Sequence, residues 1–182
     1  QLAAENDVKV IAFCEDVAAS GGYWLACAAD EIIVDDNSIV GSIGVISSSM
    51  GFVEAIKKIG VERRLHTAGD NKSFMAPFLP EKKADVTRLK TIQNDMHDSF
   101  KAYVSERRDG KLKDDPEIFS GAFWTGKRAL DLGLVDAVGD MRATLRDRFG
   151  NDVQMRVFKE HKSWLSRRLS GAHHQANVGV WA

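Results

Sequence analysis

Short apolar runs alternate with amphipathic stretches along this chain of 182 residues. Short β-branched runs bounded by acids or turn residues are typical of buried strands, whereas apolar side chains that recur every three or four positions indicate helices. We therefore expect strands over residues 8–14, 31–34, 39–46, 61–66, 134–138 and 153–158. We expect helices over residues 23–29, 52–59, 80–106, 125–132 and 145–149. This order of strands and helices predicts an α/β fold built from short units.

Two segments show no such period. Residues 67–80 are typical of a loop, and a loop of this length in a compact domain is often functional. From Lys162 onward, apolar and basic side chains mix in a short segment. That composition suits contact with a membrane surface or a partner subunit, and it equally suits a solvated terminus. We therefore expect one domain over residues 1–160 and a basic amphipathic or disordered tail over residues 161–182.

The composition narrows the function classes. Hydrophobic residues make up 44% and charged residues 28%, which are ordinary values for a soluble globular domain. The formal net charge of −1 argues against a nucleic-acid partner. Cys14 and Cys27 belong to no Cys-x-x-Cys or Cys/His cluster, so we expect buried structural thiols and no metal site. The chain begins at Gln1 without an initiator methionine, and we expect that an upstream part is missing.

The stretch from Ala18 to Trp24 joins the first predicted strand to the first predicted helix. Ser20 stands among small residues at this turn, where a helix N-terminus stabilises negative charge. Such a serine suits a nucleophile that attacks a carbonyl, with the amide of Gly21 ready to bind the oxyanion. The alternative is a structural one, because serine is also a favoured helix N-cap.

A nucleophilic serine needs a base, and the sequence offers two kinds. His66 ends a predicted strand, although a lone histidine there is more often structural. Lys72 lies in the loop 52 positions after Ser20 (72 − 20) and precedes an apolar run that contains Phe74 and Phe78. Burial against apolar groups lowers the pKa of a lysine and makes it a usable base near neutral pH. A solvated loop lysine remains the alternative.

Several ordered motifs resemble one known family, the signal peptide peptidase A family of bacterial serine peptidases with a Ser/Lys dyad. The likeness extends from about Val8 to Val157, and the ordered motifs together are specific where each alone would be weak. The matching stretches are Ala19 to Tyr23, Val40 to Val45, Lys72-Ser73, Pro77-Phe78, Phe119 to Gly126 and Ala129 to Asp136.

The resemblance implies roles for individual residues. It makes Ser20 the nucleophile and Lys72 the general base, with Ser42 orienting the lysine amine and the Gly21 amide donating to the oxyanion. Dyad chemistry requires no metal and no organic cofactor. The implied fold is a crotonase/Clp-peptidase-like α/β fold, with short β-β-α units and a long helix after the catalytic lysine loop. The apolar loop residues either shape a substrate groove or pack in the core; they are Phe74, Met75 and Phe78.

The resemblance also implies a setting. Family members form membrane-anchored homo-oligomers, and in short members neighbouring subunits contribute the serine and the lysine. The family's membrane anchor and its upstream glycine-rich turn, which supplies a second oxyanion amide, have no counterpart in this sequence. We expect a catalytic domain on the periplasmic or extracytoplasmic side of a bacterial inner membrane.

The activity expected from these residues is that of a serine endopeptidase. It would cleave extended apolar peptides, such as released signal peptides, through an acyl-enzyme. Two other classes stay open: a catalytically weak crotonase-like scaffold or peptide-binding module, and an acyl-CoA enzyme on the same fold. The intact set of Ser20, Ser42 and Lys72 argues against the scaffold, and an acyl-CoA enzyme would not need a buried lysine opposite a serine.

Overall fold

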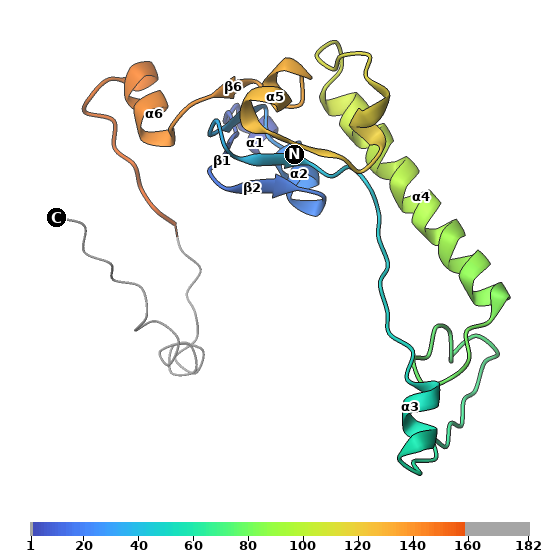
Figure 1. The fold of residues 1–182 in the computed structure, drawn as a ribbon. Helices are drawn as coiled ribbons and strands as arrows, with labels where there is room; N and C mark the ends of the chain where they lie inside the picture. Colours follow the sequence, from blue (N-terminus) through green and yellow to red (C-terminus); the bar gives the residue numbers. More distant parts are fainter. Residues whose placement is uncertain (1, 159–182) are drawn as a thin grey trace, which may run out of the picture. The chain divides into compact units, whose positions relative to one another are not determined.

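A computed structural model describes residues 2–158, and Figure 1 traces its elements in sequence order. The strands are β1 (Ile11–Cys14), β2 (Val17–Ala19), β3 (Glu31–Val34), β4 (Ile39–Gly41), β5 (Phe123–Thr125) and β6 (Ala137–Val138). The α-helices are α1 (Leu2–Glu5), α2 (Gly21–Ala26), α3 (Val53–Lys58), α4 (Lys83–Arg107), α5 (Gly126–Asp131) and α6 (Met141–Phe149). A 3₁₀ helix, η1, covers Pro116–Phe119.

The strands form two small sheets, and each of two successive strand-strand-helix units contributes one strand to each sheet. β1 and β3 pair in parallel, and β6 joins β3 in parallel, giving the order β1-β3-β6. β2 and β4 also pair in parallel, and β5 adds to β4 antiparallel, giving the order β2-β4-β5. The chain therefore repeats strand, strand, helix over β1-β2-α2 and β3-β4-α3, and the long helix α4 follows the lysine loop. The predicted α/β class, its β-β-α units and its long helix are confirmed.

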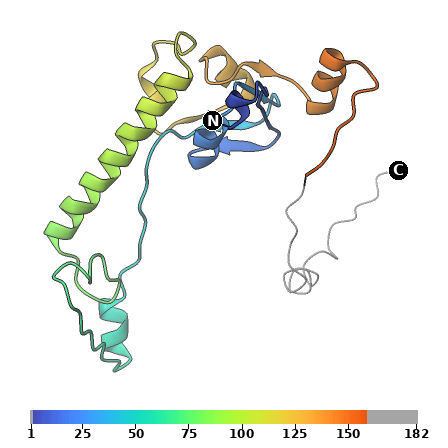
Figure 2. The ribbon, with the colours of Figure 1, turned by 180° about the vertical axis from the view of Figure 1, so that it is seen from behind.

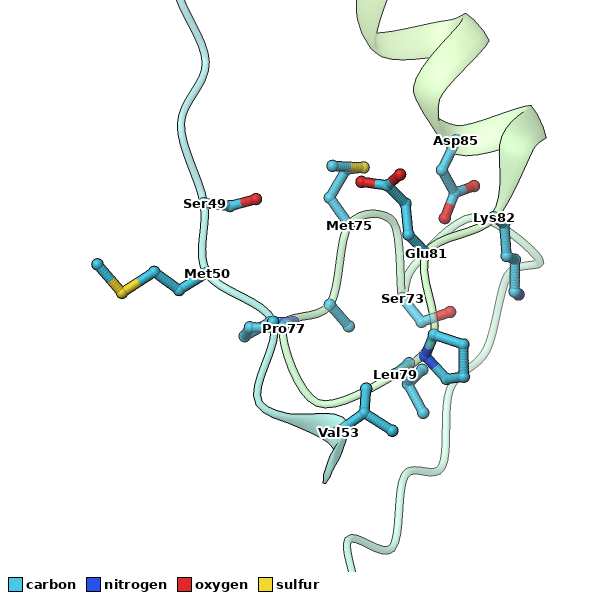
Figure 3. Close-up of a pocket in the computed structure, with 13 residues that line it drawn as sticks. Ser49, Met50, Val53, Ser73, Met75, Pro77, Leu79, Glu81, Lys82 and Asp85 are labelled. Atoms are coloured by element: carbon cyan, nitrogen blue, oxygen red, sulfur yellow. The ribbon is translucent and has the colours of Figure 1, made fainter. Parts of the chain in front are cut away.

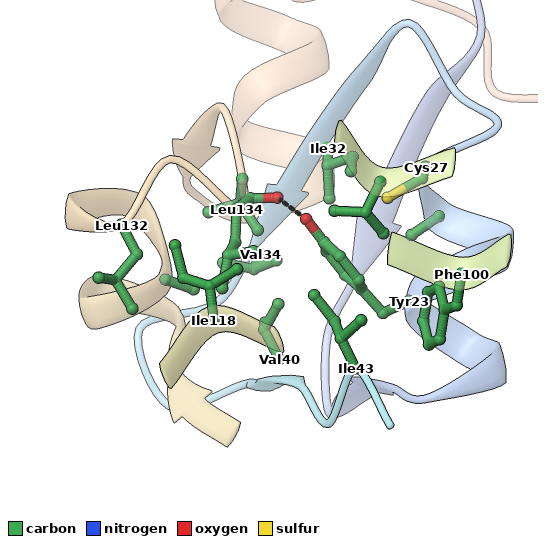
Figure 4. Close-up of a cluster of buried hydrophobic side chains, with 14 residues drawn as sticks. Tyr23, Cys27, Ile32, Val34, Val40, Ile43, Phe100, Ile118, Leu132 and Leu134 are labelled. Atoms are coloured by element: carbon green, nitrogen blue, oxygen red, sulfur yellow. Dashed lines mark hydrogen bonds between the residues drawn. The ribbon is translucent and has the colours of Figure 1, made fainter. Parts of the chain in front are cut away.

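The core gathers around the buried ring of Tyr23 (Figure 4). Apolar side chains from β3, β4, α2, α4, η1 and the segment after α5 surround it, because each of these elements turns one apolar face inward. Tyr23 is fully buried, and its phenol donates a hydrogen bond of 2.6 Å to the carbonyl oxygen of Leu134. The cluster includes Cys27, Ile32, Val34, Val40, Ile43, Phe100, Val104, Ile118, Leu132 and Leu134.

Helix α4 is one continuous element in both Figure 1 and the reverse view of Figure 2. It begins at Lys83 and not at the predicted Pro80, because the backbone of Lys82 is still extended. Its predicted apolar stripe packs only in part. Phe100 is buried at 2% exposure, whereas Ile92 and Met96 are 44% and 52% exposed. The middle of the stripe, at Ile92 and Met96, is therefore largely uncovered in the single chain.

Several strand predictions were wrong or too long. Residues 61–66 and 153–158 alternate like strands but form none, since a strand needs a partner for its backbone groups. The predicted strand over residues 39–46 ends at Gly41, where the backbone turns into positive φ at Gly41 and Ser42. The first strand begins at Ile11, three residues later than predicted, and the last covers only Ala137–Val138. The strands β2 and β5 were not predicted as separate elements.

The described chain divides into two compact units between Thr144 and Leu145. The tail predicted over residues 161–182 lies outside the described residues. None of the helices within residues 2–158 combines the length and the apolar character needed to cross a membrane. Cys27 is buried and Cys14 half-buried, both are free thiols, and burial raises the pKa of each. Over the same residues, no group of three or more metal-ligating side chains comes together.

Candidate active site

Ser20 stands at a strained turn between β2 and α2. Its φ is 52° and its ψ is −123°, a backbone region that residues with a Cβ rarely adopt. Its N–H donates to the carbonyl oxygen of Gly41 at 2.8 Å, which pins the turn to the end of β4. Ser20 holds the N-cap position, as the structural alternative requires, but its side chain makes no capping hydrogen bond. Because the residue is also exposed, its hydroxyl is accessible for chemistry.

The backbone amides that follow Ser20 form the first turn of α2. The N–H groups of Tyr23 and Trp24 both donate to the carbonyl oxygen of Ser20. The amides of Gly21 and Gly22 belong to the first turn, where a helix leaves its N–H groups without internal acceptors. Among the described residues, neither of these two amides donates a backbone hydrogen bond, so both can bind an incoming acceptor. This arrangement can stabilise negative charge that develops next to the Ser20 hydroxyl.

The sheet brings Ser42 beside this turn. In the parallel pair β2–β4, Ala19 lies opposite Gly41, so Ser20 and Ser42 follow at the same end of neighbouring strands. Ser42 also has a φ of 52°, and its N–H donates to the carbonyl oxygen of Ala122 at 2.7 Å. The structure therefore holds two of the predicted site residues, both on strained turns, next to each other.

Lys72 does not join them in the single chain. It is exposed in a loop of successive turns, with its N–H donating to the carbonyl oxygen of Gly69 at 3.2 Å. Within residues 2–158, its amine makes no hydrogen bond with Ser20 or Ser42. The alternative base, His66, is exposed in the preceding segment, and no hydrogen bond links it to Ser20 either.

The apolar residues after Lys72 line local hollows. Met75, with a φ of 52°, borders a pocket of about 210 Å³ together with Val53 and Leu79 (Figure 3). Phe78 packs against Phe52 with ring centroids 5.6 Å apart, and Phe74 is half-buried. The backbone N–H of Phe52 donates to the carbonyl oxygen of Pro77 at 2.7 Å and ties this loop to the start of α3. The assignment of Phe74, Met75 and Phe78 to a substrate groove stays a prediction.

Sequence reasoning missed two long-range polar contacts, of which the first adjoins a predicted site residue. The His97 ring lies with Nε2 3.0 Å from the carbonyl oxygen of Ile43, the residue after Ser42. The carboxylate of Asp136 accepts hydrogen bonds from the side chains of Arg108 and Lys111 and from the backbone N–H of Ile32. Periodicity gave no signal for either contact, because the partners lie 54 and 104 positions apart for His97–Ile43 and Ile32–Asp136.

Comparisons with known proteins identify the class. The family model for peptidase family S49 matches residues 3–150, so the chain belongs to peptidase family S49, a family of serine peptidases. The family resemblance predicted from the motifs is confirmed.

Two relatives match most of this chain over only part of their own length. A Brucella abortus protein named "Na(+)/H(+) antiporter NhaA" is 55% identical over 93% of this chain and 23% of its own length. A Buchnera aphidicola protein (from Acyrthosiphon pisum) named "Probable protease SohB" is 33% identical over 92% of this chain and 49% of its own length. The chain therefore spans less than half of either relative.

One solved structure with a similar chain is that of a membrane-bound stomatin-specific protease in complex with a substrate peptide. It covers 91% of this chain and 70% of its own, with a TM-score of 0.46 and 14% sequence identity. A likeness of this size carries no argument about function.

Proposed function

We propose that this chain forms the catalytic part of a serine endopeptidase that uses Ser20 as its nucleophile and Lys72 as its general base. The observation that carries the proposal is the Ser20 turn, in a member of family S49: a strained, exposed serine directly before the first amides of α2, with a side chain that makes no capping hydrogen bond. A serine that served only as an N-cap would use its hydroxyl to bond a first-turn amide.

The proposed reaction has two steps. The Ser20 Oγ attacks the scissile carbonyl while its proton passes to the neutral amine of Lys72, and the Gly21 amide stabilises the oxyanion. Lys72 then returns the proton to the leaving amine, which leaves an acyl-enzyme ester on Ser20. A water molecule deprotonated by Lys72 hydrolyses this ester and regenerates the serine. Ser42 orients the lysine amine throughout, as the third member of a triad does.

The base is proposed to come from a second copy of the chain. Lys72 contacts neither serine within the described part of its own chain, and its loop is exposed. The uncovered apolar stripe of α4 at Ile92 and Met96, together with the exposed Phe123 on β5, offers surface that an assembly would bury. We therefore propose a homo-oligomer in which one subunit supplies Ser20 and its neighbour supplies Lys72.

The proposed substrate is an extended apolar peptide, such as a released signal peptide. An open hollow of about 640 Å³ with mostly apolar lining extends along β1, β2 and one side of α2, and it reaches Gly22 beside the nucleophile. β2 lies at the edge of its sheet, so its outer side can pair with an extended chain. We place this activity at the extracytoplasmic side of a bacterial inner membrane, where such peptides are produced.

Hydrolysis of a fluorogenic apolar peptide by the full-length protein tests the proposal, with Ser20→Ala as the variant. Ser47→Ala, at an exposed serine in the segment before α3, is the matched control. We expect Ser20→Ala to lose at least about 10³-fold in kcat with its assembly intact, because the covalent route is gone. Equal activity of Ser20→Ala and wild type would reject Ser20 as nucleophile. Absence of cleavage in every variant, with peptide still bound, would instead favour a peptide-binding scaffold.

A further inference from the structure

His97 contacts the turn that carries Ser42. Its Nε2 lies 3.0 Å from the carbonyl oxygen of Ile43, and the ring is half-buried between α4 and the turn after β4. A carbonyl oxygen can only accept a hydrogen bond, so Nε2 carries the proton and donates. The bond therefore fixes the ring tautomer and connects the long helix to the residue that follows Ser42.

The turn around Ser42 is held from several sides. The Ser42 N–H donates to the carbonyl oxygen of Ala122, and the Ile43 side chain is fully buried in the core. Gly44 lies so close to Gly121 that a Cβ on Gly44 would come within 3.1 Å of the Gly121 Cα. These contacts hold the turn at Ser42 and Gly44, and the carbonyl of Ile43 between them is held by His97. A strained residue such as Ser42 keeps its conformation only when its surroundings fix it in this way.

The same side of α4 also holds the nucleophile's helix. Phe100, one turn after His97, stacks on Trp24 with ring centroids 4.5 Å apart. Arg107 Nε donates to the carbonyl oxygen of Cys27 at 2.7 Å, at the C-terminal end of α2. His97 therefore contacts the turn at Ser42, whereas Phe100 and Arg107 contact α2 and its C-terminal end. α4 thus contacts both the turn that carries Ser42 and the helix that follows Ser20.

We propose that His97 is a positioning residue for the peptidase reaction. By donating Nε2–H to the Ile43 carbonyl, it fixes the Ser42 turn and thereby the hydroxyl that orients the lysine amine. This inference rests on the proposed function. Loss of the His97 bond loosens the base and slows proton transfer, while the substrate hollow along β1 and β2 is unaffected. A displacement of the order of 1 Å in such a group can cost up to about 100-fold in rate.

The test is a double-mutant cycle in the full-length protein, with peptide hydrolysis as the readout. The variants are His97→Leu, Ser42→Ala and the pair combined, with His97→Gln as the conservative variant because its amide can reach as far as Nε2. Gln93→Leu is the matched control, since Gln93 is half-buried one turn earlier on α4 and its side chain has no hydrogen-bond partner among the described residues. If His97→Leu does not fold, His97→Asn replaces it. The asparagine side chain is too short for its amide to reach the position of Nε2, which lies 3.0 Å from the Ile43 carbonyl oxygen.

The expected result is a fall in kcat of about 10- to 100-fold for His97→Leu with KM unchanged. His97→Gln should keep most of the activity, and the double variant should be no slower than Ser42→Ala alone, because both changes act through one group. Losses that multiply in the double variant, or a raised KM with unchanged kcat, would overturn the role of His97. The proposed function itself fails in a different way, namely if wild type and Ser20→Ala cleave equally, so the two failures can be told apart.

Discussion

Tyr23 and Leu134 are joined across 111 positions by a buried hydrogen bond of 2.6 Å from the Tyr23 phenol to the Leu134 carbonyl oxygen (Figure 4). Burial raises the pKa of Tyr23 far above its usual value, so the phenol keeps its proton and donates. The N–H of Tyr23 in turn donates to the carbonyl oxygen of Ser20 at 3.0 Å. Through its side chain and its backbone N–H, Tyr23 therefore anchors the serine turn to the segment that leads into β6.

Removal of this phenol should destabilise the fold. In Tyr23→Phe the buried Leu134 carbonyl loses its donor, and an unsatisfied buried acceptor costs about 1–3 kcal/mol. The measurement is urea unfolding followed by circular dichroism, in which the midpoint should fall with the slope unchanged. Tyr103→Phe is the control, because the half-buried Tyr103 makes no hydroxyl hydrogen bond within the described part of the chain. Equal midpoints for Tyr23→Phe and wild type would show that the bond contributes nothing.

Asp136 should make stability depend on acid pH. Partial burial alone would raise its pKa, but hydrogen bonds from Arg108, Lys111 and the Ile32 N–H outweigh burial and hold the pKa at about 2. In an unfolded chain, the pKa of an aspartate is about 3.9. Because the folded pKa is the lower one, the stabilisation is complete above about pH 4 and is lost as the pH falls towards 2.

Unfolding free energies of wild type and Asp136→Asn over a pH series test this. At pH 7, Asp136→Asn should be less stable by about 3 kcal/mol, since the 3% exposed Arg108 keeps its charge without a carboxylate to balance it. The two stability curves should approach each other as the pH falls from 4 to 2. Asp114→Asn, at an exposed carboxylate, should follow wild type throughout. A constant gap between Asp136→Asn and wild type at every pH would contradict the linkage.

Gly126 should not tolerate a side chain. It opens α5 directly beside β3, and an added Cβ would collide with the Asp35 carbonyl oxygen and lie 2.8 Å from Val34 Cγ2. A backbone oxygen cannot move aside without shifting the strand, so Gly126→Ala should cost about 3 kcal/mol or more. Gly51→Ala is the control, because a Cβ there meets nothing within 4 Å. Thermal unfolding should show a clear fall in Tm for Gly126→Ala only.

Local patterns predicted the elements whose cause is local. The strand Glu31–Val34 was predicted with its observed bounds, and the helices Val53–Lys58 and Gly126–Asp131 were each predicted one residue too long at both ends. Apolar period and a following glycine specify such segments by themselves. Residues 61–66 failed because their alternation is strand-like but no neighbouring strand pairs with them. Strand formation depends on a partner that the segment itself does not encode.

Sequence motifs predicted the candidate site residues but not the contacts that hold them. The Ser20 turn was predicted from small residues after a strand, whereas Ser42 was expected within a strand and was marked only by the family motif. The β2–β4 register brings the two serines together. The contact of His97 with Ile43 could not be predicted, because it depends on how far along α4 the turn after β4 meets the helix. The same holds for the half-exposed stripe, since the pattern at Ile92 and Met96 indicates an apolar face without saying whether this chain or another covers it.

Subunit mixing tests whether neighbouring chains share the dyad. Ser20→Ala and Lys72→Ala should each be inactive alone, since each lacks one half of every site. Co-expression of the two should restore activity, because a Lys72→Ala subunit with its intact serine then adjoins a Ser20→Ala subunit with its intact lysine. With random mixing in a closed ring, about one quarter of the sites are complete, so about one quarter of the wild-type rate is expected.

The control for this experiment replaces the Lys72→Ala partner by a subunit that carries both substitutions. Its mixture with Ser20→Ala holds no intact serine and should stay inactive, which excludes restoration by assembly alone. Suppose that both single variants are inactive and that mixed oligomers form. If the mixture is then still inactive, each chain must use its own Lys72. The 67–80 loop would then have to bring the amine to Ser42 within one subunit, a contact that the described residues of the single chain do not make.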